Sequence, residues 1–67
     1  MPLIQVNLIE GRSPEKIEQL MKQLTEVTAT TLDAPKESVR VLVNEVPDTH
    51  WGVAGETMKK RRQNNQK

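Results

Sequence analysis

The feature that most limits how this chain can fold is its short length combined with a lack of cysteine. With 67 residues, it buries too small a fraction of its surface to gain a comfortable margin of stability. Proteins of this size commonly add disulfides, a metal ion or partner subunits. The chain has no cysteine, and its single histidine, His50, cannot form a metal site alone. We therefore expect a homo-oligomer that holds no metal and no cofactor.

Basic residues gather in the C-terminal segment. Five of the ten Lys and Arg residues lie at 59–67, while the other 58 residues carry five basic and nine acidic residues, a net charge of −4. We expect residues 1–57 to form one domain and residues 58–67 to form a basic, disordered tail. Such a cluster can bind polyanions, but no aromatic residue is interleaved with it for stacking on bases. The sequence therefore predicts no nucleic-acid partner, although an interaction module acting through the tail stays open as an alternative function.

The first residues, Met-Pro-Leu-Ile-Gln-Val, lack the basic segment and the continuous apolar stretch of a targeting signal. No apolar run in the sequence is long enough to span a bilayer. We expect a cytoplasmic protein without a membrane partner.

Alternating apolar residues predict two strands. In residues 2–9, Ile4, Val6 and Leu8 share one face, and Pro2 stands at the first position, where a strand tolerates proline. Residues 39–46 alternate in the same way, and both segments carry apolar side chains on both faces. This pattern is typical of a sheet that is covered on each side.

A helix is expected between these strands. Ser13 suits the N-cap and Pro14 the first helical position, while Pro35 should end the helix near residues 32–33. Apolar and threonine side chains recur on one face of this helix, at Ile17, Leu20, Met21, Leu24, Val27, Thr28 and Thr31.

Strand, helix and strand of these lengths form one βαβ unit with parallel strands. The glycine-punctuated residues 50–55 are expected to add a short C-terminal hairpin. Two strands are too few for a stable sheet. The predicted fold class is therefore α/β (α+β), a single βαβ unit whose sheet is completed by oligomerisation.

Pro2 is the first candidate for chemistry, although it could do no more than begin a strand. If Met1 is removed, Pro2 exposes a secondary amine, and an α-amino group titrates near neutrality, far below a lysine. Burial and nearby cations favour the neutral form of such a group. A neutral amine suits proton abstraction next to a carbonyl.

Two arginines and the only aromatic residue are the other candidates. Arg12 follows the first strand, where it is either simply solvated or a ligand for an anion. Arg40 lies inside an apolar strand, so its guanidinium needs a carboxylate, supplied by a ligand or internally by Glu45 or Glu10. Trp51 is either filling for a core or interface, or the wall of a site.

Four segments together carry a recognisable pattern: Met-Pro-Leu-Ile-Gln-Val, Leu-Ile-Glu-Gly-Arg-Ser-Pro-Glu, Leu-Asp-Ala-Pro-Lys-Glu-Ser-Val-Arg-Val and His-Trp-Gly-Val-Ala-Gly-Glu. In a chain of this length, the combination resembles the 4-oxalocrotonate tautomerase family, from Pro2 to about Glu56. The resemblance implies the tautomerase fold and an assembly of βαβ dimers, commonly three dimers in a hexamer. It also implies that each site is drawn from more than one subunit.

Roles for individual residues follow from the same resemblance. Pro2, freed by removal of Met1, would be the catalytic base, and Arg12 and Arg40 would bind the substrate. Trp51 stands where the family most often has phenylalanine and would form the aromatic wall, while the backbone amide of Ile9 would help to bind the substrate. The implied enzyme is an isomerase that interconverts enol and keto forms of unsaturated 2-hydroxy or 2-oxo dicarboxylic acids such as 2-hydroxymuconate, in aromatic hydrocarbon catabolism or another pathway.

One further alternative keeps the fold and changes the reaction, because this superfamily also includes dehalogenases and decarboxylases. The dehalogenases need an extra acid to activate water, so a carboxylate of Glu45, Asp48 or Glu56 beside Pro2 would favour them. Tryptophan in place of phenylalanine would also change the pocket shape and the substrate preference.

Overall fold

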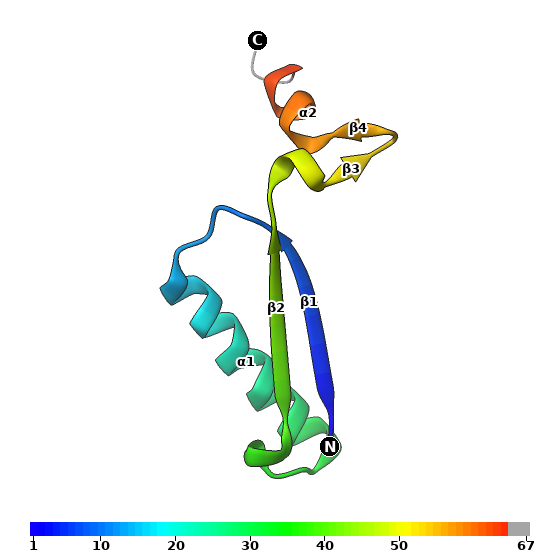
Figure 1. The fold of residues 1–67 in the computed structure, drawn as a ribbon. Helices are drawn as coiled ribbons and strands as arrows, with labels where there is room; N and C mark the ends of the chain where they lie inside the picture. Colours follow the sequence, from blue (N-terminus) through cyan, green and yellow to red (C-terminus); the bar gives the residue numbers. More distant parts are fainter. Residues whose placement is uncertain (65–67) are drawn as a thin grey trace.

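A βαβ unit forms the body of the molecule (Figure 1). The structure, a computed structural model, describes residues 1–64. Strands β1 (Leu3–Ile9) and β2 (Arg40–Val46) pair in parallel, with Leu3 opposite Arg40 and Ile9 opposite Val46. Helix α1 (Pro14–Leu32) lies against one face of this two-stranded sheet. The predicted βαβ unit with parallel strands is confirmed.

Helix α1 begins and ends where its sequence signals indicate. The Ser13 side chain accepts a hydrogen bond from the Lys16 N–H at 3.3 Å, and Pro14 occupies the first helical position. At the other end Asp33 adopts a left-handed conformation with φ 55°, and its N–H donates to the Ala29 carbonyl. Pro35 follows two residues later and prevents continuation of the helix.

The interior between α1 and the sheet is thin. Among the described residues only Ala29 and Val39 are buried, with 8% and 7% of their surface exposed. Val27 and Thr31, which the periodicity placed on the core face, are exposed instead. Two strands about 4.8 Å apart are narrower than a helix about 10 Å across, so they cannot cover the whole apolar stripe.

The second face of the sheet is uncovered in the single chain. Leu3 and Leu42 are 61% and 55% exposed there. The side-chain amide of Asn44 donates to Asn7 Oδ1 at 3.3 Å on the same face. The predicted cover on both sides is therefore present on one side only, which leaves an apolar surface that a second subunit can bury.

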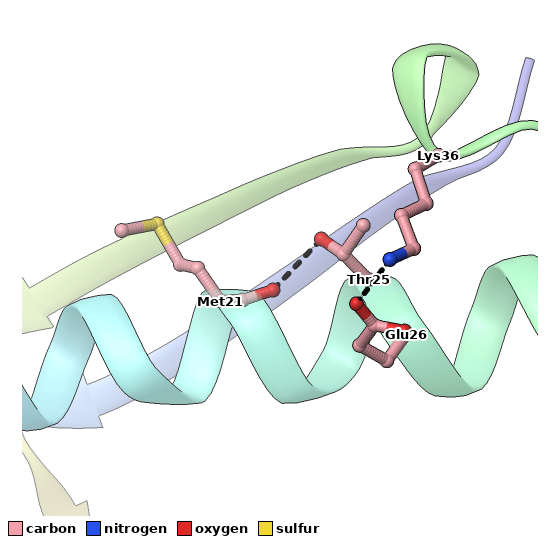
Figure 2. Close-up of polar contacts among 4 residues, drawn as sticks. All are labelled: Met21, Thr25, Glu26 and Lys36. Atoms are coloured by element: carbon pink, nitrogen blue, oxygen red, sulfur yellow. Dashed lines mark hydrogen bonds and ion pairs between the residues drawn. The ribbon is translucent and has the colours of Figure 1, made fainter.

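Polar contacts fix the turn from α1 into β2. The short helix η1 (Lys36–Ser38) precedes β2, and Lys36 Nζ lies 2.6 Å from Glu26 Oε1 on α1. Figure 2 shows this pair beside the hydrogen bond from Thr25 Oγ1 to the Met21 carbonyl, which is 2.8 Å long. The hydrogen bond and charge of Glu26 raise the pKa of Lys36 above its usual value.

Beyond β2 the chain forms a second region, which we call the arm, residues 48–64. It contains η2 (Asp48–His50), β3 (Gly52–Val53), β4 (Glu56–Thr57) and α2 (Met58–Asn64), and it projects past the end of the body (Figure 1). Strands β3 and β4 form an antiparallel hairpin joined by Ala54 and Gly55, both with positive φ. The predicted hairpin is present, shifted a few residues towards the C-terminus.

Residues 58–64 form α2, so the expectation of a disordered tail is not met there. The Thr57 hydroxyl accepts a hydrogen bond from the Lys60 N–H at 3.2 Å and caps the first turn. Arg61 and Arg62 form ion pairs with Glu56 and Asp48, which hold the helix against the rest of the arm. Residues 65–67 of the predicted tail lie outside the described residues.

In residues 1–64, every helix is too short or too polar to cross a bilayer.

Candidate active site

Pro2 and Arg40 lie together at one end of the body, which we call the proline end. The N–H of Arg40 donates to the Pro2 carbonyl at 3.0 Å, the first bond of the parallel ladder. Pro2 is half-buried, while Met1 lies before β1 and is 87% exposed. Removal of Met1 would therefore leave the bond that anchors Pro2 intact.

The Arg40 side chain takes neither of the internal partners considered above. Its Nη1 donates to the backbone carbonyls of Glu37, at 2.6 Å, and Val39, at 3.3 Å. Glu45 pairs with Leu8 near the far end of β1, and Glu10 follows that strand. In residues 1–64 the guanidinium thus has backbone partners and no carboxylate, and it is exposed at the edge of the uncovered sheet face.

Ile9, Arg12 and Trp51 lie at the opposite end, which we call the arm end. Ile9 is the last residue of β1, Arg12 is exposed in the following loop, and Trp51 leads from η2 into the hairpin. Because β1 has seven residues, the two ends are roughly 20 Å apart at about 3.3 Å per residue. A single chain therefore divides the predicted site residues into two groups and does not bring them together.

The amide of Ile9 points away from the strand partner. Pro2 accepts from Arg40 and Glu10 donates to Val46, so even-numbered residues of β1 bond to β2. Backbone groups of successive residues in a strand alternate between its two edges. The Ile9 N–H consequently faces the outer edge of β1, which no other strand of residues 1–64 covers.

The three carboxylates that would favour a dehalogenase beside Pro2 also lie at the arm end. Glu45 is close to the end of β2. Asp48 and Glu56 belong to the arm, where each forms an ion pair with an arginine. Within one chain the proline end therefore receives none of these three acids.

One surface hollow of the described residues lies away from the predicted site residues. It is an open depression of about 370 Å³ on the solvent side of α1, lined by Glu15, Glu18, Gln19, Lys22 and Gln23. In residues 1–64 there is also no group of three His, Asp or Glu side chains placed to hold a metal ion.

The sequence did not predict the ion pairs of Arg61 and Arg62, because residues 58–67 were expected to form a disordered tail. A signal was available in Thr57, which precedes Met-Lys-Lys-Arg-Arg, a run of good helix formers. An N-cap residue before such a run predicts a helix start, even when the run is strongly charged.

Comparison with known proteins identifies the family. Residues 2–61 match the family of tautomerase enzymes. A probable tautomerase of Ralstonia nicotianae is 60% identical over 55 residues, which cover 82% of this chain and 79% of the relative. A 2-hydroxymuconate tautomerase of Pseudomonas sp. (strain CF600) is 48% identical over 92% of this chain and 98% of its own.

Solved structures agree. A 4-oxalocrotonate tautomerase homologue of the tomaymycin biosynthetic pathway superposes with a TM-score of 0.90 at 45% identity, covering 92% of this chain and 95% of the other. A heterohexameric 4-oxalocrotonate tautomerase from Chloroflexus aurantiacus superposes with a TM-score of 0.86 at 38% identity. The match covers 90% of this chain and 97% of the other. The chain belongs to the tautomerase family and has the 4-oxalocrotonate tautomerase fold. It is an enzyme of the isomerase class.

Proposed function

We propose that this enzyme interconverts the enol and keto forms of unsaturated 2-hydroxy and 2-oxo dicarboxylic acids, such as 2-hydroxymuconate. The observation that carries the proposal is the division of polar groups between the two ends of the body. The proline end carries Pro2 and Arg40, which are joined by the hydrogen bond from the Arg40 N–H to the Pro2 carbonyl, and removal of Met1 would turn the Pro2 nitrogen into an amine. The arm end offers a second guanidinium, Arg12, an outward-facing amide, Ile9, and an aromatic side chain, Trp51. A dicarboxylate that meets both groups needs more than one subunit.

Association follows from the same proposal. A proline end of one subunit and an arm end of another would form each site, in a homohexamer built as a trimer of dimers. The uncovered face with Leu3 and Leu42 supports such burial, as does the scarcity of buried side chains. The heterohexameric relative shows that the fold can form six-subunit assemblies.

In the proposed reaction the nitrogen of Pro2, freed from Met1, accepts the proton of the 2-hydroxyl group. The electron pair moves along the conjugated chain, and the same nitrogen returns the proton to the distal carbon. This gives the conjugated ketone with no net change in protons or electrons. Arg40 would bind the nearer carboxylate and stabilise the negative charge that develops on the 2-oxygen.

The residues of the arm end would bind and enclose the substrate. Arg12 would hold the far carboxylate, since a guanidinium matches the geometry of a carboxylate with two parallel hydrogen bonds. The Ile9 amide would donate a further hydrogen bond. Trp51 would exclude water, and a drier site favours the neutral form of the Pro2 amine.

Retention of Met1 tests the base directly. While Met1 is present, the Pro2 nitrogen is an amide and cannot accept a proton, so this material should assemble normally but be inactive in an enol-to-ketone absorbance assay. The matched control is the same preparation after removal of Met1, with both N-termini verified by mass spectrometry. Full activity in protein that retains Met1 throughout would remove Pro2 from the mechanism.

Two further measurements extend this test. Pro2→Ala, after Met1 removal, should keep partial activity, because a primary amine still accepts a proton but is less well placed.

The rate of the wild-type enzyme should fall at low pH as the Pro2 amine becomes protonated. Burial and two guanidinium groups should bring that pKa below the roughly 7.7–8.0 of a model α-amine.

A further inference from the structure

Helix α2 returns to the residue that precedes the hairpin. After β3 and β4, the N–H of Met58 donates to the carbonyl oxygen of Trp51 at 2.8 Å. Met58 is the first residue of α2, so the helix starts from a direct backbone bond to Trp51. Figure 1 shows α2 next to η2 and the hairpin, and α2 contacts both η2 and β4.

Two adjacent arginines connect α2 to the chain on both sides of Trp51. Arg62 Nη1 lies 3.7 Å from Oδ2 of Asp48, which begins η2 just before Trp51. Arg61 Nη1 lies 3.9 Å from Oε1 of Glu56, in the strand after the hairpin turn. All four side chains are partly exposed, so each pair alone is weak and is screened by salt. Together they restrain the segment from both directions.

Apolar packing within the arm contributes little to holding the segment that contains Trp51. Both buried side chains of the described residues, Ala29 and Val39, belong to the body or its edge. The arm strands have two residues each, and a short two-stranded hairpin is marginally stable at best. The contacts that the structure gives around Trp51 are instead polar: the backbone bond from Met58 and the two ion pairs of α2 on either side.

We propose that Arg61 and Arg62 are positioning residues that hold Trp51 in the orientation in which it closes the substrate site. The inference rests on the proposed function, because Trp51 affects the reaction only as the wall of that site. It gives the basic C-terminal residues 61 and 62 a role within the enzyme itself. Their loss should loosen Trp51 and weaken substrate binding, while the proton transfer at the proline end continues.

Fluorescence measures the first consequence. Trp51 is the only aromatic residue of the chain, so emission reports on it alone. Arg62→Gln and Asp48→Asn should each lower the emission anisotropy of Trp51 and shift its emission to the red. The double variant should shift no further than either single variant, because both remove the same pair. Raising the salt concentration should move the wild-type emission towards that of Arg62→Gln.

Kinetics measure the second consequence. Arg62→Gln should raise KM for the dicarboxylate by about threefold or more and keep kcat within about twofold, because binding is weakened and the base is untouched. Lys59→Gln is the matched control, since it removes the same charge from an exposed side chain of the same helix. It should change neither the emission nor KM.

Wild-type emission and KM in Arg62→Gln would overturn the proposal. So would a joint loss of thermal stability and kcat without a change in emission, because α2 would then support only the fold. The fluorescence result also separates this proposal from the proposed function. If the protein has no tautomerase activity but its emission responds as expected, the hold of α2 on Trp51 stands and the function fails.

Discussion

The body and the arm are both incomplete, but they lack different things. The body has two seven-residue strands in continuous register and a 19-residue helix with defined caps at both ends. What it lacks is cover for the sheet face that exposes Leu3 and Leu42. The arm has two-residue strands and a seven-residue helix, tied together by backbone bonds and two ion pairs. In the proposed assembly the body depends on apolar burial by other subunits, whereas the arm is held by polar contacts that it makes itself.

This difference also divides the proposed chemistry. The proline end of the body would carry the proton transfer, and the loop and arm at the other end would bind and enclose the substrate. Changes in the body should then affect assembly or kcat, and changes at the arm end should affect KM. A variant at the arm end that changes assembly or kcat, or a variant in the body that changes only KM, would contradict this division of roles.

The largest effect is expected from the uncovered sheet face. Leu42→Lys should prevent association and unfold the chain, because burial of a leucine contributes about 1.5–3 kcal/mol per subunit. The body buries too few other apolar side chains to offset the loss of this free energy. Sedimentation at micromolar concentration together with circular dichroism measures both outcomes. Gln23→Lys, which adds the same charge on the exposed side of α1, should leave assembly intact. A compact, well-folded Leu42→Lys monomer would contradict the dependence of the body on partners.

The two arginines separate the ends by kinetics. Arg40→Ala should lower kcat by about 100-fold, because it removes a donor from the charge that develops in the transition state. Arg12→Ala should chiefly raise KM for dicarboxylates by about tenfold, the loss of about 1.4 kcal/mol of binding. A substrate analogue without the far carboxylate is the control, since the Arg12 effect should disappear with it. If both variants keep the wild-type kcat/KM, neither arginine binds the substrate.

The sequence predicted the body well because local signals there agree with one another. Ser13, Pro14 and Pro35 set the bounds of α1, and the alternation of residues 2–9 and 39–46 set both strands. Features that depend on contacts between distant parts of the chain were not predicted. Periodicity alone could not tell that a two-stranded sheet is too narrow to cover Val27. The pairing of Arg61 and Arg62 depends on carboxylates that only the fold brings near.

The residues of the candidate site were predicted through the resemblance to a family and stay a prediction, and one chain does not bring them together. Pro2 and Arg40 are neighbours because the parallel register pairs Leu3 with Arg40, so that the Arg40 N–H bonds to the carbonyl of Pro2. Arg12 and Trp51 lie at the other end for the same reason. Joint action of these two groups in one site, as proposed, would require contacts between subunits, which a single sequence does not describe.

The smallest expected effect concerns the turn of the arm. Ala54 and Gly55 have φ of 54° and 83°, and positive φ at both central residues is typical of the hairpin turn that favours Asn-Gly. Alanine is strained in that conformation, whereas asparagine tolerates it. Ala54→Asn should therefore stabilise the arm by about 0.5 kcal/mol, an approximately twofold gain in protection of its amides from hydrogen exchange.

The most informative amide is that of Met58, because its hydrogen bond to Trp51 closes the arm. Gly55→Ala is the matched control and should have the opposite sign, since it introduces a side chain at a φ that glycine adopts without strain. Amides in the middle of β1 and β2 should keep their protection in both variants, because the arm opens locally while the assembled body stays closed. If both variants change the protection of body and arm amides equally, the two regions unfold as one unit. The arm would then depend on subunit contacts as strongly as the body does.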